Sequence, residues 1–368
     1  MSPVGVPEAL NARAQGVADA FGTHTGVRVD AAALLTGRAA LLGLTTNGQI
    51  SAGGATRILR GEDTWCAVTL SRPDDIAAVP ALIETDDVGA DPWPPLQRWV
   101  RTRSATAAVA RARLLDLPAA VLGETAPGPP VTRAHGPSGE RPGRLLVVDM
   151  SSMWAGPLCG RLLGDAGATV IKVESPRRPD GTRAGPVPFY DWMNRGKLSY
   201  AVDLDDEPAM RRLLEAADVV IEGSRPAALS RRGLGPADIA PRAGRIWLRI
   251  SGYGSEGDVG MRVAFGDDAA VAGGLVGSGP DGPVFVGDAI ADPLTGLHAA
   301  AAVVESLARG GGELIEMSMS ATAACYAGFV GGPVREPTEP ETGTSASALG
   351  ADNAAVHALL DERHSVSC

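Results

Sequence analysis

The sequence has no long apolar run and no excess of basic residues, and each shortage excludes a class of protein. No stretch approaches the ~18 consecutive apolar residues that span a bilayer. The first residues also lack the basic and then apolar pattern of a secretory signal. A net charge of −10 argues against a nucleic-acid surface, which needs clustered lysine and arginine. We therefore expect a cytoplasmic protein that binds neither membranes nor nucleic acids.

Cysteine is also scarce, with four residues in a chain of 368. None of them forms a CxxC pair, and no histidine stands at a spacing typical of a zinc site. We therefore expect reduced thiols and no metal site. The four residues are Cys66, Cys159, Cys325 and Cys368.

The second half of the chain alternates short apolar runs with helical patterns. Helices are expected at 157–166 and 207–216, and strands at 145–149, 170–174, 219–222, 246–251 and 284–286. Nearly continuous apolar strands that alternate with helices indicate a parallel sheet covered on both faces. We predict an α/β fold with a doubly wound, Rossmann-like sheet domain and a smaller α+β domain.

Two stretches rich in proline, glycine and polar residues, 125–144 and 331–347, divide the chain. The smaller domain is expected before the first stretch, where helical patterns surround a strand pattern at 64–73. The predicted organisation is a small domain with N-terminal helices at 1–124, a linker at 125–144, the Rossmann-like domain at 145–330, and a flexible segment with a terminal helix at 331–368.

Ligands of such sheets bind at the carboxyl ends of the strands, beside helix N-termini. The loops at 151–157 and 223–226 occupy that position. The first loop lacks the GxGxxG pattern of dinucleotide-binding proteins. Its free amides could bind a phosphate or a carboxylate, although an ordinary strand-to-helix turn is the alternative.

Five motifs follow one another in the sheet domain: DMSSMWAGP at 149–157, GATVIKVESP at 167–176, MNRGK at 193–197, DVVIEGSRP at 218–226 and SGYG at 251–254. A sixth, ADPLTG at 291–296, begins a helix rich in small residues. In this order the motifs resemble those of CoA-transferase family III, which includes formyl-CoA and carnitine CoA-transferases and the α-methylacyl-CoA racemases.

The resemblance makes Asp292 a candidate nucleophile. It implies transfer of CoA between carboxylic acids through an aspartyl anhydride and then an aspartyl-CoA thioester, which conserves the energy of the acyl bond. The substrates would be an acyl-CoA and a carboxylic acid, with no permanently bound cofactor. Local sequence alone favours a simpler role, since aspartate before proline is typical of a helix N-cap.

Two further segments resemble accessory parts of the family's site. Asp267 and Asp268 lie in a segment in which the racemases have a histidine. Asp267 stands at that position, and an aspartate is a poor base unless burial raises its pKa. One of the two could instead cap the following helix. Gly53 and Gly54 match a glycine-rich loop that closes over the nucleophile, although a plain hairpin turn is the alternative.

The resemblance also implies a set of CoA-binding positions. Ser175 stands where the family often has arginine or lysine, and Gly223–Ser224 replaces a common Phe-Asn pair. Nearby arginines, Arg183 among them, either substitute for the missing cation or belong to a solvated loop. His298 is expected to pack within its helix. The positions are Ser152, Trp154, Lys172, Ser175, Arg183, Arg195, Lys197 and Arg225.

The order of the halves departs from the family pattern, because the segment that resembles the small domain comes first. The chain therefore resembles a rearranged member or the second half of a larger duplicated protein. A homodimer, or pairing with a related CoA-transferase chain, is expected. Three functions remain open: a CoA-transferase, an acyl-CoA racemase or isomerase of the same fold, and a non-catalytic CoA-binding subunit.

Overall fold

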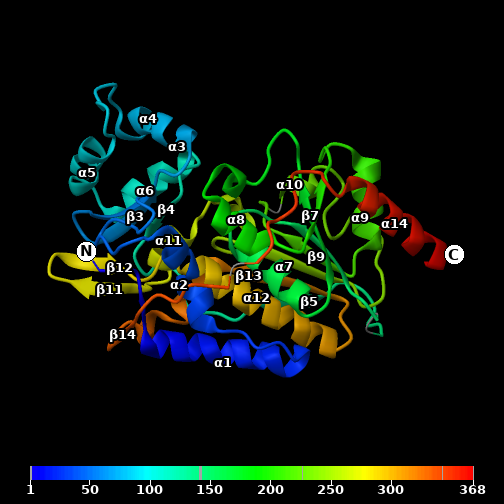
Figure 1. The fold of residues 1–368 in the computed structure, drawn as a ribbon. Coiled ribbons are helices and arrows are strands. Elements are labelled where there is room, and N and C mark those ends of the chain that lie inside the picture. Colours follow the sequence, from blue (N-terminus) through cyan, green and yellow to red (C-terminus); the bar gives the residue numbers. More distant parts are fainter. Residues whose placement is uncertain (1, 141–142, 226, 342, 368) are drawn as a thin grey trace.

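A sheet of seven strands forms the centre of the molecule (Figure 1). The computed structural model describes residues 2–140, 143–225, 227–341 and 343–367. Strand order is β5-β13-β10-β9-β6-β7-β8, and every neighbouring pair is parallel except β5 with β13. The predicted α/β class with a mostly parallel sheet is confirmed. The strands are β5 (Val131–Ala134), β6 (Leu146–Met150), β7 (Thr169–Glu174), β8 (Leu198–Ala201), β9 (Val219–Glu222), β10 (Ile246–Ser251) and β13 (Glu313–Ser318).

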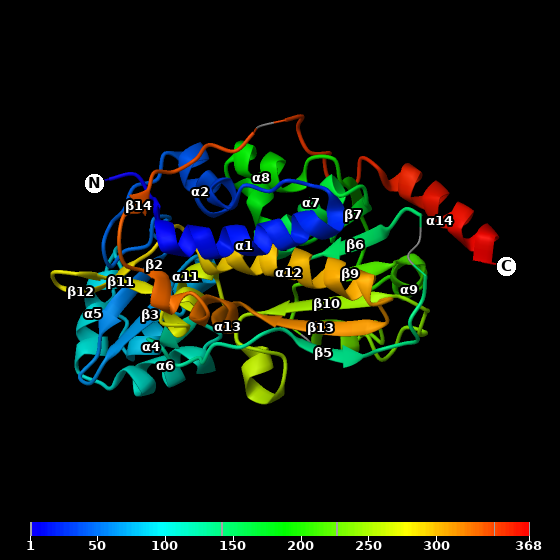
Figure 2. The ribbon, with the colours of Figure 1, turned by 90° about the horizontal axis from the view of Figure 1, so that it is seen from below.

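Helices cover both faces of this sheet (Figure 2). Neighbouring side chains of a strand point to opposite faces, so Val147 joins one apolar cluster while Leu146 and Val148 join the other. The first cluster includes α1 (Glu8–Thr25), α7 (Ala155–Asp165) and α12 (Ala291–Ala308). The second includes α9 (Glu207–Ala216) and α14 (Asn353–Ser367). This double covering explains why the strands are apolar almost throughout.

Helices α7 and α12 pack closely near their N-termini. A Cβ atom added to Gly296 would lie 2.6 Å from the carbonyl oxygen of Ala155. Only glycine permits this approach without displacing α7. The two helix N-termini are therefore held side by side at the end of the sheet.

A smaller α+β unit lies beside the sheet. Its three antiparallel strands are ordered β2-β3-β4, and its helices enclose a core that includes Val68, Leu82, Leu96 and Val109. The helical segment after α4 is divided into two helices, because Ser104 accepts a hydrogen bond from the Ala107 amide and begins the second one. The elements are β2 (Thr56–Arg60), β3 (Trp65–Thr69), β4 (Ala119–Val121), α3 (Pro73–Ala77), α4 (Val79–Ile83), α5 (Trp93–Arg101) and α6 (Ala105–Leu114).

The N-terminal helices do not pack in this smaller unit, although the predicted boundary at residue 124 groups them with it. Residues Leu10, Ala14, Ala18 and Phe21 form an apolar stripe on α1 that is buried in the first cluster of the sheet domain. Figure 2 shows α1 lying along α12. The stripe packs against α12, whose sequence is rich in alanine.

Two other segments differ from the prediction. The stretch expected to be a linker contains β5, whose residues pair with residues 313–316 of β13 at the edge of the sheet. The strand expected at 284–286 is β12 (Gly282–Phe285), which pairs with β11 (Val276–Gly279) in a separate hairpin. A short run of valines and phenylalanine does not by itself indicate which sheet a strand joins.

The remaining elements connect these layers. Strands β1 (Val6–Pro7) and β14 (Val334–Arg335) form an antiparallel pair, which joins the segment before α1 to the segment after η3. The other helices are α2 (Ala31–Leu42), α8 (Val187–Asn194), α10 (Ala227–Ser230), α11 (Gly266–Ala272) and α13 (Met319–Ala324), with 3-10 turns η1 (Gly181–Ala184), η2 (Gly257–Met261) and η3 (Ala327–Phe329).

Candidate active site

Asp292 lies in the first turn of α12, directly against the first turn of α7. The helix begins at Ala291, and the N-cap residue Ile290 makes no side-chain capping bond. The carboxylate of Asp292 instead accepts a hydrogen bond from the backbone N–H of Ala155, the first residue of α7. The prediction of a simple N-cap is therefore wrong. The carboxylate lies between two helix N-termini, whose partial positive charges favour an anion.

Three other aspartates gather around Asp292, and we call the four residues the acid cluster: Asp267, Asp268, Asp288 and Asp292. The first two lie at the start of α11, against the start of α12. A Cβ atom on the preceding residue, Gly266, would lie 2.3 Å from Oδ2 of Asp292. The Asp267 carboxylate accepts a bond of 3.1 Å from the Ala289 amide, three residues before the nucleophile candidate.

Burial raises the pKa of Asp292 to about 7. The Ala155 amide and the charge of Arg38 lower that pKa, whereas the charge of Asp267 raises it. Burial likewise raises the pKa of Asp267 to about 7, with a further contribution from Asp288. Asp267 and Asp292 are half-buried residues. Because the two carboxyls interact, their titrations belong to the pair.

Asp268 is a structural member of the cluster. It is fully buried, and burial raises its pKa to about 6. Its carboxylate accepts hydrogen bonds from the Tyr253 hydroxyl at 2.6 Å, the Phe265 amide at 2.8 Å and the Thr69 hydroxyl at 3.2 Å. The helix-cap alternative therefore holds for Asp268, which also ties α11 to β3. Of the two aspartates, Asp267 has the larger effect on the pKa of Asp292.

Arg38 is the cation next to the acid cluster. It projects from α2, and its Nη1 atom donates to both carboxylate oxygens of Asp288 at 2.7 Å. Its guanidinium carbon lies 5.6 Å from the ring centre of Trp154 and 5.3 Å from that of Phe189. The two rings meet edge to face at 5.2 Å. The aromatic pair therefore forms a wall that supports the guanidinium.

Gly53 and Gly54 lie in the turn between residues 51 and 56. Gly54 has a φ of +79°, a left-handed conformation that favours glycine. A Cβ atom on Gly53 would lie 3.7 Å from Nη2 of Arg38, and both glycines are exposed. The side chain of Ser51, at the start of this turn, hydrogen-bonds to Asp267. The predicted loop therefore borders the acid cluster, through Arg38 and Asp267.

Backbone strain is concentrated beside the cluster. Met153 and Ala289 have φ values of 73° and 43°, in the left-handed region that residues with a Cβ atom rarely adopt. Met153 precedes Trp154 and the start of α7, and Ala289 precedes α12. The Met153 amide donates to both oxygens of Asp180 at 3.2 Å, which holds the strained turn before α7 in place. Such outliers persist where the surrounding structure over-determines them, commonly at functional sites.

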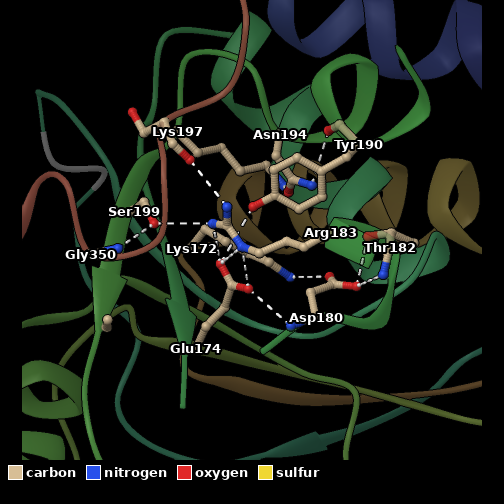
Figure 3. A network of polar contacts seen from close by, with 12 residues as sticks. Lys172, Glu174, Asp180, Thr182, Arg183, Tyr190, Asn194, Lys197, Ser199 and Gly350 are labelled. Atoms are coloured by element: carbon tan, nitrogen blue, oxygen red, sulfur yellow. Dashed lines mark hydrogen bonds and ion pairs between the residues drawn. The ribbon is translucent and has the colours of Figure 1, made fainter. Parts of the chain in front are cut away.

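Two of the predicted CoA-binding lysines are buried in ion pairs (Figure 3). Lys172 donates to Asp180 at 2.8 Å, and the two side chains are 1% and 0% exposed. Lys197 donates to Asp149 at 2.8 Å, to the Pro157 carbonyl at 2.8 Å and to Asn194 at 3.1 Å. The structure does not present either ammonium group to a ligand. Both stabilise the turn that leads into α7.

The predicted arginines also have protein partners. In Figure 3 the Arg183 guanidinium faces Glu174, at 2.6 Å, and its carbon lies 4.4 Å from the centre of the Tyr190 ring. Arg195 donates to the Glu341 carbonyl at 2.8 Å. Arg225 pairs with Asp116 of the smaller unit at 3.1 Å, with about a third of its side chain exposed. Its neighbour Pro226, in the predicted loop 223–226, lies outside the described residues.

The other predicted positions surround the strained turn. Ser152 is exposed in the turn itself, and Ser175 is partly exposed after β7, where its hydroxyl accepts from the Arg177 amide at 3.3 Å. Trp154 is 3% exposed, and its ring lies against Arg38, the cation next to the acid cluster. Its indole N–H has no acceptor within the part of the chain that the structure describes. The structure therefore brings Trp154, but not the lysines, to Asp292.

Comparison with known proteins identifies the family of the chain. The family model described as CoA-transferase family III matches residues 144–357, which is more than half of the chain. The chain belongs to CoA-transferase family III. The matched residues include the whole parallel part of the sheet, from β6 to β13, together with Asp292.

Relatives within the family match the chain over part of their length. The succinyl-CoA–D-citramalate CoA-transferase of Chloroflexus aurantiacus is 31% identical over 204 residues, 50% of this chain and 51% of that protein. The succinyl-CoA:glutarate CoA-transferase of Homo sapiens is 37% identical over 177 residues, 44% of this chain and 40% of that protein. This family III chain thus spans about half the length of these relatives.

A solved structure is also similar. It is a CAIB/BAIF family protein from Brucella suis, with 30% identity, a TM-score of 0.44, and coverage of 52% of this chain and 58% of that one.

Within the described residues, no group of three or more histidine, cysteine, aspartate and glutamate side chains could hold a metal ion. In the same part of the chain, no helix has the length and apolar content needed to cross a bilayer.

Two residues of the acid-cluster region were not among the predicted site residues of this family III chain. Arg38 and Asp288 are 250 positions apart, so no local motif connects them. A signal existed at Arg38, which is the one charged residue in the apolar helix sequence AAALLTGRAALL. A lone arginine in such a helix needs a buried partner.

His298 packs as predicted: burial lowers its pKa to about 4, and its Nε2 atom lies 2.8 Å from the Tyr326 hydroxyl.

The pKa of Asp292 predicts a pH-dependent reaction. Nucleophilic attack needs the carboxylate, so the rate of covalent capture should rise with pH to a plateau, with a midpoint of about 7. Replacing Asp267 with Asn removes a charge that raises this pKa, so the midpoint should fall. Quenched-flow measurements of the capture rate between pH 5 and 9 give the midpoint for the wild type and for Asp267→Asn. A flat profile for the wild type, or an unchanged midpoint in Asp267→Asn, would contradict the coupling.

The same pKa shifts predict how pH affects the fold. Asp267, Asp268 and Asp292 have higher pKa values in the folded chain than aspartate has in an unfolded one. Their contribution to stability is therefore fully present below about pH 4 and is lost as the pH rises through about 7. Urea unfolding at pH 5 and pH 8 measures the difference, which should shrink in Asp267→Asn.

Gly266 predicts a steric effect on the nucleophile candidate. In Gly266→Ala the new methyl group would meet both the Ala289 carbonyl and Oδ2 of Asp292 at 2.3 Å, so the carboxylate must move. We expect at least about a 100-fold slower reaction, the usual effect of a displacement near 1 Å. Gly16→Ala is the matched control, because a methyl group there meets nothing within 4 Å. Equal rates for both variants would show that Asp292 need not lie where the structure places it.

Proposed function

We propose that this chain moves CoA between carboxylic acids, with Asp292 as the nucleophile. The observation that carries the proposal is the placement of Asp292, a half-buried residue whose carboxylate lies at two helix N-termini and accepts from the Ala155 amide. The curated relatives, whose names describe CoA transfer to or from dicarboxylic acids, support the reaction class. A carboxylate is the group that can exchange CoA for acid without losing the acyl energy to water.

The proposed reaction has four balanced steps. The Asp292 carboxylate attacks the thioester carbonyl of the donor, forming an anhydride and releasing the CoA thiolate. The thiolate then attacks the aspartyl carbonyl of that anhydride, releasing the donor acid and leaving an aspartyl-CoA thioester. The acceptor carboxylate attacks this thioester, which forms a second anhydride and frees the thiolate. Attack of the thiolate on the acceptor's acyl carbonyl yields the new acyl-CoA and restores Asp292, with no net transfer of protons.

The residues around Asp292 support particular parts of these steps. The Ala155 amide can stabilise negative charge that develops on the aspartyl oxygen. The Gly53–Gly54 turn is exposed and borders Arg38, so it is placed to exclude water from the anhydride and the thioester. No residue is required to supply a metal or a bound cofactor, since CoA enters as a thioester substrate.

Intact-mass spectrometry of the chain mixed with a panel of acyl-CoAs tests the proposal. A CoA-sized mass increase that hydroxylamine removes is expected with at least one donor. The absence of any adduct, together with measurable binding of CoA, would overturn the transferase assignment for the chain alone. It would favour a CoA-binding subunit that acts with a related chain, an arrangement compatible with the half-length match to the relatives.

A second function, acyl-CoA racemisation, is favoured by Asp267. Its pKa of about 7 and its position beside Asp292 give it the properties of a base at neutral pH. Incubation of a 2-methylacyl-CoA in deuterated buffer, without any acceptor acid, distinguishes the two functions. Incorporation of deuterium at the α-carbon supports racemisation, whereas transfer of CoA without deuterium supports the transferase.

A further inference from the structure

We propose that Arg38 anchors a second carboxylate of the transferred acid, so that the acids handled at this site are dicarboxylic. This inference rests on the proposed function, since it names the substrate class of the same site. It assigns a binding role to a residue of the N-terminal segment, which lies outside the matched residues 144–357.

The hydrogen bonds of Arg38 leave one edge of its guanidinium available. Both bonds to Asp288 come from Nη1, and the described residues offer no hydrogen-bond acceptor to Nε or Nη2. The Nε–Nη2 edge carries two parallel N–H groups, which match the two oxygens of a carboxylate. A quarter of the side chain remains exposed. The arginine is thus fixed by one partner and keeps a bidentate donor pair.

The available edge lies within reach of the reacting group. The guanidinium carbon of Arg38 lies 5.6 Å from the ring centre of Trp154, the residue before Ala155, whose amide donates to Asp292. Its Nη2 atom borders Gly53, and the rings of Trp154 and Phe189 hold its flat face. A ligand attached at Asp292 would therefore extend between the glycine turn and the aromatic wall toward Arg38.

The charge of the site selects the type of acid. Asp288 is 1% exposed and pairs with Arg38 through Nη1, so the site already contains one buried ion pair and keeps the other edge of the guanidinium for a ligand. A monocarboxylic acyl chain would cover the Nε–Nη2 edge with carbon and leave its donors without water, which is unfavourable. A second carboxylate instead gives that edge two charge-assisted hydrogen bonds. The edge therefore favours acyl groups that end in a carboxylate.

A matched pair of donors tests the proposal. Glutaryl-CoA and pentanoyl-CoA differ only in whether the far end of the acyl chain is a carboxylate or a methyl group. We measure the ratio of their rates of adduct formation in the wild type, Arg38→Met and Arg38→Lys. The ratio should fall by about 10- to 100-fold in Arg38→Met, the usual effect of losing charge-assisted hydrogen bonds, and by less in Arg38→Lys. Any change in the reactivity of Asp292 itself cancels in the ratio.

Two further variants control the experiment. Arg60→Met removes an arginine that also stacks on a tryptophan, Trp65 at 5.3 Å, but lies outside the site, so it should leave the ratio unchanged. Arg38→Met combined with Asp288→Asn avoids leaving Asp288 as an unpaired buried charge. If Arg38→Met alone fails to fold, the double variant should fold and still show the lower ratio.

The outcomes separate this inference from the proposed function. Adducts that form from both donors with a ratio unaffected by Arg38→Met would overturn the anchor and leave the transferase standing. No adduct from any donor would overturn the transferase. In that case calorimetric titration with glutarate and pentanoate decides the anchor: binding of glutarate that Arg38→Met abolishes supports it, and equal binding of both acids, or of neither, refutes it.

Discussion

Asp292→Asn is expected to abolish covalent capture of CoA, with a fall in the rate of transfer on the order of 1,000-fold or more. The amide cannot form the anhydride, because it is a far weaker nucleophile than a carboxylate. It nevertheless has nearly the same shape, so the contact with the first turn of α7 should survive. Intact-mass spectrometry after incubation with acyl-CoA measures the adduct, and initial rates with an acceptor acid measure the transfer.

The matched control for this substitution is Asp206→Asn. Asp206 also stands at the start of a helix, where its carboxylate accepts from the Ala209 amide at 3.2 Å, but it lies on the opposite face of the sheet from the acid cluster. Its variant should form the adduct at the wild-type rate. An adduct that persists in Asp292→Asn and remains sensitive to hydroxylamine would place the nucleophile at another residue.

Lys172→Met is expected to lower the free energy of unfolding by about 3–5 kcal/mol, the range found when one partner of a buried ion pair is removed. The substitution leaves Asp180 buried and without its cation, and it removes the bond from Nζ to the Ser151 carbonyl. Desolvation opposes the charge on Lys172, but the nearby Asp149 and Asp180 outweigh it and raise the pKa of the lysine. The ammonium group therefore stays charged in the folded chain.

Urea unfolding measures this effect, and Arg177→Met is the control. Arg177 pairs with Asp203 at the surface, with the two side chains 68% and 45% exposed, so its loss should change stability by less than about 1 kcal/mol. The affinity of the folded protein for CoA separates the two roles of Lys172. A structural lysine leaves this affinity unchanged, whereas a large loss of affinity without a loss of stability would restore the predicted phosphate contact.

The architecture was predictable because its signals are local. Strands such as LVVDM and VVIE are apolar on both faces, and helical patterns separate them, which is sufficient to indicate a parallel sheet covered on two sides. The hairpin β11–β12 shows the limit of this reasoning. Its sequence favours a strand, but whether that strand joins the central sheet depends on where the chain on either side is held.

The candidate site was predictable only in part. Asp292, Asp267 and Trp154 lie in motifs that could be identified, and the structure brings them together. Lys172 and Lys197 lie in equally clear motifs, yet their ammonium groups are turned into the protein by Asp180 and Asp149. A motif shows that a lysine is present, but not whether its charge faces a ligand or a buried carboxylate.

The sequence by itself determined the class of fold, the family and the candidate nucleophile, since each depends on residues that are close together in the chain. The tertiary structure decided that α1 and α2 pack on the sheet domain, and that Arg38 meets Asp288 from 250 positions away. It also decided that the four aspartates share one site, where burial raises their pKa values. Contacts of this kind, and the loss of water that comes with them, exist only once distant segments are packed against each other, because desolvation depends on the neighbours in space and not on those in sequence.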